Sequence, residues 1–328
     1  MKIKKLLSAV IAGIMATAAL AGCGTTDETA SNDADKTYKV GVLQLVQHDA
    51  LDAATKGFMD YLTEKLGDKV EFDEQNASGD SATCATIANQ FVSSDVDLIF
   101  ANATPALQAS YSATMDIPIV GTSITDYATA LEIDDWTGKT GYNVTGSCDL
   151  APLEDQAAMF KELLPDAKKI GLLYCSAEAN SKYQVEIVAD ELAKLGYETK
   201  EYSFADSNDV AAVTTAACSE VDALYIPTDN TAASNTEIID SIAAPKNVPI
   251  IAGEAGICGG CGIATLSISY EELGRIAGEM AYEILVNGAD PAEMEIKYAK
   301  APVKKYVAER VKALGITVPD DYEVLETE

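Results

Sequence analysis

Basic residues and histidine are scarce in this sequence. Its 328 residues include 23 Lys and Arg against 52 Asp and Glu, which gives a formal net charge of −29. Binding to nucleic acid depends on clustered basic side chains that neutralise phosphates, so this composition argues against a nucleic-acid partner. Because His48 is the only histidine, a catalytic triad or a histidine-rich metal site has little material to form from.

Enzymatic motifs are also missing. The chain has no G-x-S-x-G elbow, no Walker A loop, no H-E-x-x-H segment and no G-x-G-x-x-G after a predicted strand. We therefore expect no enzyme, no cofactor and no metal site. A mechanism that uses two paired carboxylates stays open, because acidic residues are abundant.

The N-terminus has the pattern of an exported protein. Three lysines in the first five residues precede an apolar run over 6–22, which is typical of a secretory signal. The run ends in Leu20-Ala21-Gly22-Cys23, which resembles the bacterial lipoprotein signal, where the cysteine is lipidated and becomes the new N-terminus. We predict a signal peptide over 1–22, a lipid on Cys23 and a flexible tether over 23–37. A transmembrane helix is the alternative, although the run is short for one.

Six cysteines remain after Cys23. An even number outside the cell permits up to three disulfides, and the pairing stays open. The Cys258-Gly-Gly-Cys261 spacing suits a redox pair or half a zinc site, but no second C-x-x-C exists. We expect a loop disulfide or plain thiols. The six are Cys84, Cys148, Cys175, Cys218, Cys258 and Cys261.

The order of predicted elements occurs twice. Short apolar runs alternate with longer amphipathic ones, which indicates an α/β protein with parallel sheets. The second set of strands follows the first by about 130 residues, in the same order. The sequence therefore predicts two similar Rossmann-like lobes. The predicted strands cover 40–45, 69–72, 96–101 and 117–121, and then 170–173, 198–204, 221–226 and 248–251.

The chain is expected to pass between the lobes more than once. We predict an N-terminal lobe over 38–146 and 266–290, and a C-terminal lobe over 147–265 and 291–328. A multi-strand hinge would join them. Near the C-terminus we expect a helix over 270–286, a strand over 295–298 and a helix over 304–314.

The loops at the carboxyl ends of the predicted strands contain acids but no Lys or Arg. Ligands of open parallel sheets bind beyond these strand ends. Such a cleft suits a ligand with a cationic group, unless the acids are helix caps or solvated charges. The loop side chains in question are His48, Asp49, Asp126, Glu178, Asp229 and Glu254.

Two of these loops open helices. Thr104-Pro105 predicts Thr104 as an N-cap, and the Ser181-x-x-Gln184 spacing predicts a capping box. Helix N-termini can hold a carboxylate without an arginine. Together with the acids, they favour a zwitterion such as an amino acid. The alternative is that these caps serve only their helices.

Several segments, taken in order, resemble the ABC-transporter substrate-binding lipoproteins of the tryptophan/tyrosine-type family. The similarity runs from about Tyr38 to Val318. It implies a type I periplasmic-binding-protein fold, a ligand enclosed by two hinged lobes, and aromatic amino acids as the usual ligands. The segments are Asn102-Ala103-Thr104-Pro105-Ala106, Ser123-Ile124-Thr125-Asp126, Asn143-Val144-Thr145-Gly146, Glu178-Ala179-Asn180-Ser181, Pro227-Thr228-Asp229-Asn230 and Ala264-Thr265-Leu266-Ser267-Ile268.

The resemblance also implies roles for individual residues. Thr104, with Asn180 and Ser181, would hold the ligand carboxylate. Asp229, with Asp126 or Glu254, would take the ammonium group, and Gln47 and His48 would line the side-chain end. Ala103, Thr125, Glu178, Thr228 and Asn230 complete the predicted ligand-binding set.

The resemblance implies capture and delivery without chemistry. We expect a monomeric lipoprotein outside the cytoplasm, anchored through Cys23, that binds a small zwitterion and docks on an ABC permease served by a separate ATPase. The alternatives are a nucleoside- or sugar-binding lipoprotein of the same fold, or a ligand sensor for a membrane receptor.

Overall fold

The computed structural model describes residues 36–326, and the part from Thr37 onward forms one compact unit. The predicted signal peptide, Cys23 and nearly all of the predicted tether lie outside the described residues.

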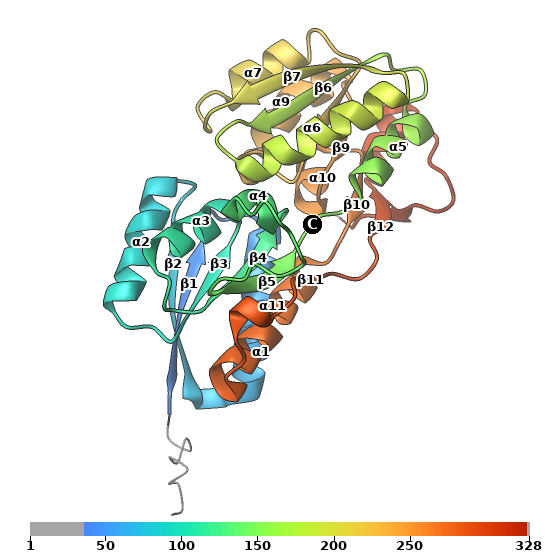
Figure 1. Cartoon of the computed structure of the whole chain (residues 1–328). Coiled ribbons are helices and arrows are strands. Elements are labelled where there is room, and N and C mark those ends of the chain that lie inside the picture. Colours follow the sequence, from blue (N-terminus) through green and yellow to red (C-terminus); the bar gives the residue numbers. More distant parts are fainter. Residues whose placement is uncertain (1–35, 327–328) are drawn as a thin grey trace, which may run out of the picture. The chain divides into compact units, whose positions relative to one another are not determined.

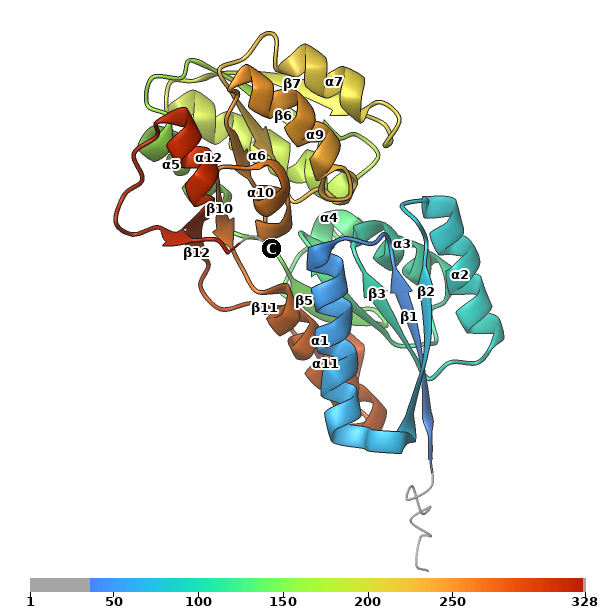
Figure 2. The same cartoon turned by 180° about the vertical axis from the view of Figure 1, so that it is seen from behind.

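The first sheet contains six strands that all run parallel, in the order β11-β5-β4-β3-β1-β2. Helices α1 and α11 pack side by side on one face, and α2 and α3 lie together on the other (Figures 1 and 2). We call this sheet and its helices the first lobe. Its strands are β1 (Tyr38–Gln44), β2 (Val70–Asn76), β3 (Leu98–Asn102), β4 (Ile119–Ile124), β5 (Val144–Cys148) and β11 (Lys297–Tyr298). Its helices are α1 (Asp49–Leu66), α2 (Ser81–Ser93), α3 (Thr104–Ala113), α4 (Tyr127–Leu131) and α11 (Tyr270–Asn287), with short 3-10 turns at Gly67–Lys69 and Pro291–Glu293.

The second sheet has the order β13-β12-β10-β9-β8-β6-β7, and only the β10–β12 pair is antiparallel. We call this sheet and its helices the second lobe. Its strands are β6 (Lys169–Cys175), β7 (Glu198–Phe204), β8 (Ala223–Ile226), β9 (Ile250–Ala252), β10 (Ala264–Ser267), β12 (Val303–Tyr306) and β13 (Glu323–Val324). Its helices are α5 (Leu153–Leu163), α6 (Ala179–Lys194), α7 (Val210–Ala217), α8 (Asn230–Ala233), α9 (Thr236–Ala243), α10 (Ala255–Cys261) and α12 (Ala308–Leu314), with a 3-10 turn at Ala244–Lys246.

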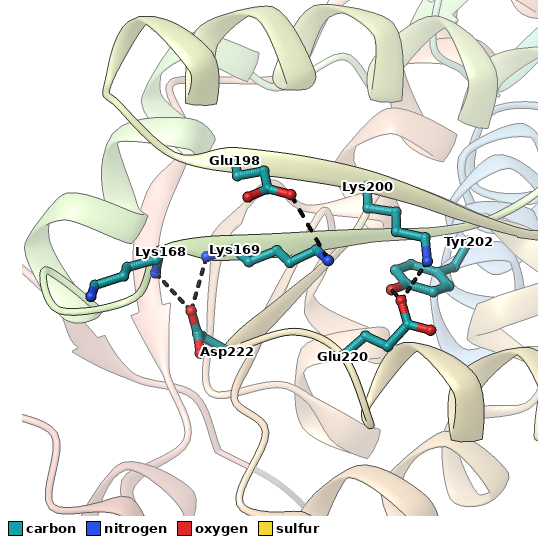
Figure 3. A network of polar contacts seen from close by, with 7 residues as sticks. All are labelled: Lys168, Lys169, Glu198, Lys200, Tyr202, Glu220 and Asp222. Carbon is teal, nitrogen blue, oxygen red and sulfur yellow. Dashed lines mark hydrogen bonds and ion pairs between the residues drawn. The ribbon is translucent and has the colours of Figure 1, made fainter.

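The two sheets repeat one topology, which confirms the predicted fold class. The order β4-β3-β1-β2 in the first sheet recurs as β9-β8-β6-β7 in the second. An aspartate at the start of the third strand of each set accepts from the first strand: Asp97 Oδ2 binds Lys39 N at 2.8 Å, and Asp222 Oδ2 binds Lys169 N at 2.9 Å. Figure 3 shows the second of these contacts beside the Lys200–Glu220 ion pair. Asp222 Oδ2 also accepts from Lys168 N, and the backbone N–H groups of Lys169 and Lys168 lower the pKa of Asp222.

Each face of each sheet is covered by a separate apolar cluster. In the first lobe, Val40 and Val42 face α1 and α11, whereas Leu43 faces α2 and α3. In the second lobe, Leu172 packs toward α5 and α6, and Leu173 toward α7, α9 and α10. Burial on both faces explains why the strands read as continuous apolar runs instead of alternating ones.

The helices α1 and α11 approach each other at glycines. A Cβ atom added to Gly274 would lie 1.9 Å from the Ala54 carbonyl oxygen, and one added to Gly57 would lie 2.2 Å from the carbonyl oxygen of Glu271. The absence of side chains at these two positions therefore sets the distance between the helices.

The C-terminal part differs from the prediction. The predicted helix over 304–314 begins only at Ala308, because 303–306 form β12, which pairs with β10. Sheet membership also departs from the expected lobe boundaries: β11 joins the first sheet, and the whole of β10 lies in the second. The chain thus passes between the sheets after β5, after β10 and after β11, at the ends of complete strands. The division into two lobes that move as units stays a prediction.

Candidate functional site

Loops at the carboxyl ends of strands from both sheets border one small cavity. They follow β1, β4 and β5 in the first lobe and β6, β8 and β9 in the second. The carboxyl ends of strands from both sheets, where the ligand is expected, therefore face the cavity. The cavity holds about 10 Å³, roughly the space of one water molecule. It is lined by His48, Leu51, Ser123, Thr125, Asp149, Asn180, Thr228, Asp229, Asn230, Ala233, Glu254 and Tyr270.

Seven of the thirteen predicted ligand-binding residues border this cavity. They are His48, Thr125, Asn180, Thr228, Asp229, Asn230 and Glu254. Gln47 lies instead on a wider cavity of about 810 Å³, which His48 also borders and which extends along α9 and α10. Among the described residues, the five others line neither cavity; they are Ala103, Thr104, Asp126, Glu178 and Ser181.

Three of the predicted acids cap helices of their own lobe. Asp126 accepts from Thr129 N at 2.7 Å at the start of α4, and Asp229 accepts from Ala232 N at 2.7 Å at the start of α8. Glu254 accepts from Gly256 N at 2.6 Å and from the backbone N–H of Ile257 at the start of α10. The alternative interpretation of these acids as caps therefore holds, although Asp229 and Glu254 also face the cavity.

The two predicted helix caps are wrong in detail. Helix α3 begins at Thr104 itself, so Ala103 takes the cap position and the buried Thr104 hydroxyl has no hydrogen-bond partner in the described structure. Helix α6 begins at Ala179, two residues before the predicted cap, which places Ser181 inside the first turn. Gln184 consequently bonds to another segment: its side chain accepts from Thr228 N and donates to Thr228 O.

The backbone is strained where two strands of the first lobe end. Ala103, after β3, has φ 93°, and Ser123, in β4, has φ 56°. Residues other than glycine rarely adopt such angles, and they gather at ligand sites when the surrounding fold holds them there. Ser123 borders the cavity, and its hydroxyl donates to Asn102 Oδ1 at 2.8 Å.

Glu178 holds two residues of the second-lobe cavity wall in place through hydrogen bonds. This 4% exposed carboxylate accepts from Asn230 N at 3.0 Å, Asn230 Nδ2 at 2.7 Å and Thr231 N at 2.9 Å, and also from the Thr231 hydroxyl and Asn180 Nδ2. Glu178 is one of the predicted ligand-binding residues. Its contacts show that it fixes two cavity-lining amides instead of lining the cavity itself.

Asp149 borders the cavity and was missed. It follows β5 in the segment where the chain leaves the first sheet. Its Oδ1 accepts from the Thr125 hydroxyl at 3.1 Å and its Oδ2 from the Tyr270 hydroxyl at 2.8 Å. Tyr270 opens α11, so the bond joins two of the segments that connect the sheets. The strand-end rule would have selected Asp149 if it had been applied to β5 as well.

Burial raises the pKa of all three carboxyls on the cavity wall. That of Asp149 rises to about 6, and hydrogen bonds from Tyr270 and Thr125 oppose the rise. The pKa of Asp229 rises further, because the Glu178 carboxylate adds to the effect of burial. That of Glu254 also rises, with His48 acting in the opposite direction.

His48 makes a contact between the lobes. Its Nε2 lies 3.2 Å from Asn230 Oδ1 on α8. His48 precedes α1, so the contact links the loops after β1 and β8. The side chain thus lies on the cavity wall, opposite the second lobe, and also borders the wider cavity.

A sequence model of the family described as ABC transporter substrate binding protein matches residues 39–328. The chain belongs to this family. It is therefore a substrate-binding protein of an ABC transporter, with the type I periplasmic-binding-protein fold, and it works outside the cytoplasm with a small-molecule ligand.

Three relatives carry informative names. The tyrosine-binding protein of Clostridioides difficile is 40% identical, over 87% of this chain and 85% of its own length. An ABC domain from Streptococcus pneumoniae, solved in complex with L-Trp, is 35% identical with a TM-score of 0.83, over 87% of this chain and 97% of that one. A substrate-binding protein with adhesive properties from Clostridium difficile, solved in a ligand-free, open structure, is 35% identical with a TM-score of 0.67, over 89% of this chain and 100% of that one.

The six cysteines that the structure describes are buried thiols. All six in the described part are free, which decides between the two expectations in favour of plain thiols. Cys258 and Cys261 lie in α10, and burial raises the pKa of both, which is unfavourable for a reactive dithiol. Within residues 36–326, no cluster of His, Cys, Asp and Glu could hold a metal ion, and no helix is long and apolar enough to cross a membrane.

Proposed function

We propose that this substrate-binding protein captures an aromatic amino acid, tyrosine or tryptophan, and delivers it to its ABC permease without chemical change. The observation that carries the proposal is the ligand named for two relatives, tyrosine at 40% identity and L-tryptophan at 35% identity. Both similarities extend over 87% of this chain.

The chemistry of the cavity wall supports a ligand with an amino group. Three carboxylates and one imidazole border the cavity, and no Lys or Arg does so in the described part of the chain. A buried carboxylate without a cationic partner is unfavourable, and a ligand ammonium group would supply that partner. Leu51, Ala233 and the Tyr270 ring give the same wall apolar surface for an aromatic side chain.

The size of the cavity supports a mechanism in which the two lobes separate to admit the ligand. A volume of about 10 Å³ is far below the roughly 300 Å³ of a small ligand pocket. The three segments that connect the sheets would act as the hinge, and closure around the ligand would remove it from water.

The membrane anchor is a further part of the proposal. The lipoprotein signal that ends at Cys23 supports a mature protein that starts at residue 23 and is held on the cell membrane by lipid. The acidic tether over 24–37 would keep the lobes free to reach the permease.

Mass spectrometry of small molecules released from the purified protein tests the proposed ligand. We expect tyrosine or tryptophan, and a thermal-shift screen should show the largest stabilisation with the same amino acid. A released nucleoside or sugar, with no stabilisation by any aromatic amino acid, would instead favour the alternative solute classes of this fold. Turnover of the bound molecule would contradict the assignment as a binding protein.

A further inference from the structure

Two buried polar atoms without partners belong to residues on opposite walls of the small cavity. In the described structure, His48 Nδ1 and Asn180 Oδ1 make no hydrogen bond. His48 comes from the first lobe and Asn180 from the second, and both line the cavity. A buried polar atom without a partner is costly, so each of these two atoms would gain from a hydrogen-bond partner on a ligand in the cavity.

The contact with Asn230 determines which nitrogen of the neutral His48 ring carries the hydrogen. Asn230 Nδ2 donates to Glu178 Oε2 at 2.7 Å, which turns Asn230 Oδ1 toward the imidazole. An amide oxygen only accepts, so His48 Nε2 must carry the hydrogen that points at it. In the neutral ring, Nδ1 is then left as an acceptor.

The orientation of the Asn180 amide is fixed in the same way. Its Nδ2 lies 3.0 Å from Thr228 O and 3.2 Å from Glu178 Oε2, and both of these atoms are acceptors. A flipped amide would turn its oxygen toward them, so the assignment of nitrogen and oxygen is determined. Asn180 is 6% exposed, and its Oδ1 therefore has little access to bulk water.

We propose that His48 Nδ1 and Asn180 Oδ1 together accept two N–H groups of the ligand's ammonium, one from each side of the cleft. This inference rests on the proposed function, because it assumes that the ligand is an amino acid, and it assigns the atoms that recognise the amine. Asp149 and Glu254, which border the same cavity, supply the opposite charge. The ligand would then bridge the lobes beside the His48–Asn230 contact.

The same geometry disfavours a carboxylate at this position. Both atoms accept, and the nearby charges are negative, so an anionic group at this position would face two acceptors. The cleft should therefore distinguish an amino acid from the analogue that lacks only its amino group. A site that hydrogen-bonds a substrate N–H rejects such an analogue strongly, because its own polar atoms stay unpaired.

Two substitutions of His48 separate its nitrogen atoms. His48→Asn places an amide oxygen near the position of Nδ1 and loses the contact to Asn230. His48→Gln places an amide nitrogen near the position of Nε2, which keeps that contact and removes the acceptor. Binding of L-tyrosine and L-tryptophan is compared by calorimetry with binding of 3-(4-hydroxyphenyl)propanoic acid and 3-(indol-3-yl)propanoic acid in the same buffer.

We expect the wild-type protein to prefer the amino acid over its desamino analogue by about 100-fold or more, as two hydrogen bonds to a charged group imply. His48→Gln should reduce this preference by about tenfold or more, and His48→Asn should keep it within about threefold. Equal losses in both variants, or an unchanged preference in His48→Gln, would overturn the inference. If the wild-type protein binds neither amino acid, the proposed function fails first.

A spectroscopic measurement tests the inference without substitution. Because His48 is the only histidine in the sequence, ¹⁵N-histidine labelling of tag-free protein yields one pair of ring signals. We expect the Nε2–H tautomer in the complex with L-tyrosine or L-tryptophan, and a shift of the Nδ1 signal when the ligand binds. An Nδ1–H tautomer, or an Nδ1 signal that does not change at saturating ligand, would overturn the inference.

Discussion

At the scale of single residues, the carboxylates of the cavity differ in the donors that satisfy them. Asp229 and Glu254 accept backbone N–H groups of α8 and α10, which the fold keeps in place. Asp149 accepts from two side-chain hydroxyls, those of Thr125 and Tyr270. Hydroxyl groups can rotate toward another acceptor, so Asp149 is the carboxylate that can most easily accept a new donor from a ligand.

Asp149→Asn should change how stability depends on pH. The folded-state pKa of Asp149, about 6, exceeds the ordinary value of 3.8. Its stabilising contribution is therefore complete below about pH 4, where the carboxyl is protonated in both states, and it is lost as the pH rises through 6. Relative to the variant, the wild-type free energy of unfolding should fall by on the order of 2 to 3 kcal/mol from about pH 4 to pH 7. Urea unfolding checks this, with the exposed Asp116→Asn as control; parallel pH curves for all three proteins would contradict it.

Glu178→Gln should weaken both stability and binding. The substitution keeps the shape of the side chain but replaces an acceptor oxygen by a donor, opposite the N–H groups of Asn230 and Thr231. We expect the free energy of unfolding to fall by about 2 to 3 kcal/mol, because buried donors lose a charged acceptor. Affinity for tyrosine or tryptophan should fall as well, since the cavity amides lose their orientation. Glu186→Gln, on the exposed face of α6, is the matched control and should change the free energy by less than about 0.5 kcal/mol.

At the scale of helices and strands, the strand topology shared by the two sheets places the cavity at the carboxyl ends of strands from both lobes. The order of the strands along the chain could be predicted, because apolar runs and turn residues mark each strand locally, as in the Val96-Asp97 and Val221-Asp222 pairs. The strand ends that border the cavity could be predicted from that order. The helix starts could not, since Thr104 and Ser181 are good cap residues in sequence but fall one and three residues past the actual caps. Most of β12 was predicted as the start of the helix over 304–314, because its pairing with β10 depends on residues distant in the sequence.

Gly274→Ala should separate α1 from α11. The new methyl group would lie 1.9 Å from the Ala54 carbonyl oxygen, and backbone on both sides has to move to relieve the clash. Overpacking of this kind costs about 1 to 3 kcal/mol, which thermal unfolding detects as a lower Tm. Val286→Ala, at an exposed position of α11, is the control. An unchanged Tm for Gly274→Ala would show that the helices do not depend on this close contact.

At the scale of the whole molecule, the distribution of the negative charge is informative about the ligand. Some of the 52 acidic residues lie at the surface in ion pairs, such as Glu198 with Lys169 and Glu220 with Lys200 (Figure 3). The buried wall keeps its few carboxylates free of Lys and Arg. Net charge alone excluded a nucleic-acid partner; the distribution of the charges is what supports an amine ligand.

Cys23→Ala should release the protein from the membrane. Without a cysteine at the end of the signal, no lipid can be attached, and the chain has no membrane-spanning helix within its described residues. Fractionation of cells that express the full chain should find the wild type with the membranes and the variant in the soluble extracytoplasmic fraction, or still attached through an uncleaved signal that migrates at higher mass. A variant that stays membrane-bound at the mature mass would contradict the proposed anchor.

Calorimetric titration of the ligand-free, tag-free chain from residue 24 onward tests the central proposal most directly. We predict saturable binding of L-tyrosine or L-tryptophan, one molecule per chain, and no measurable binding of nucleosides or sugars under the same conditions. Saturable binding of a nucleoside or sugar, with no heat from any aromatic amino acid, would contradict it.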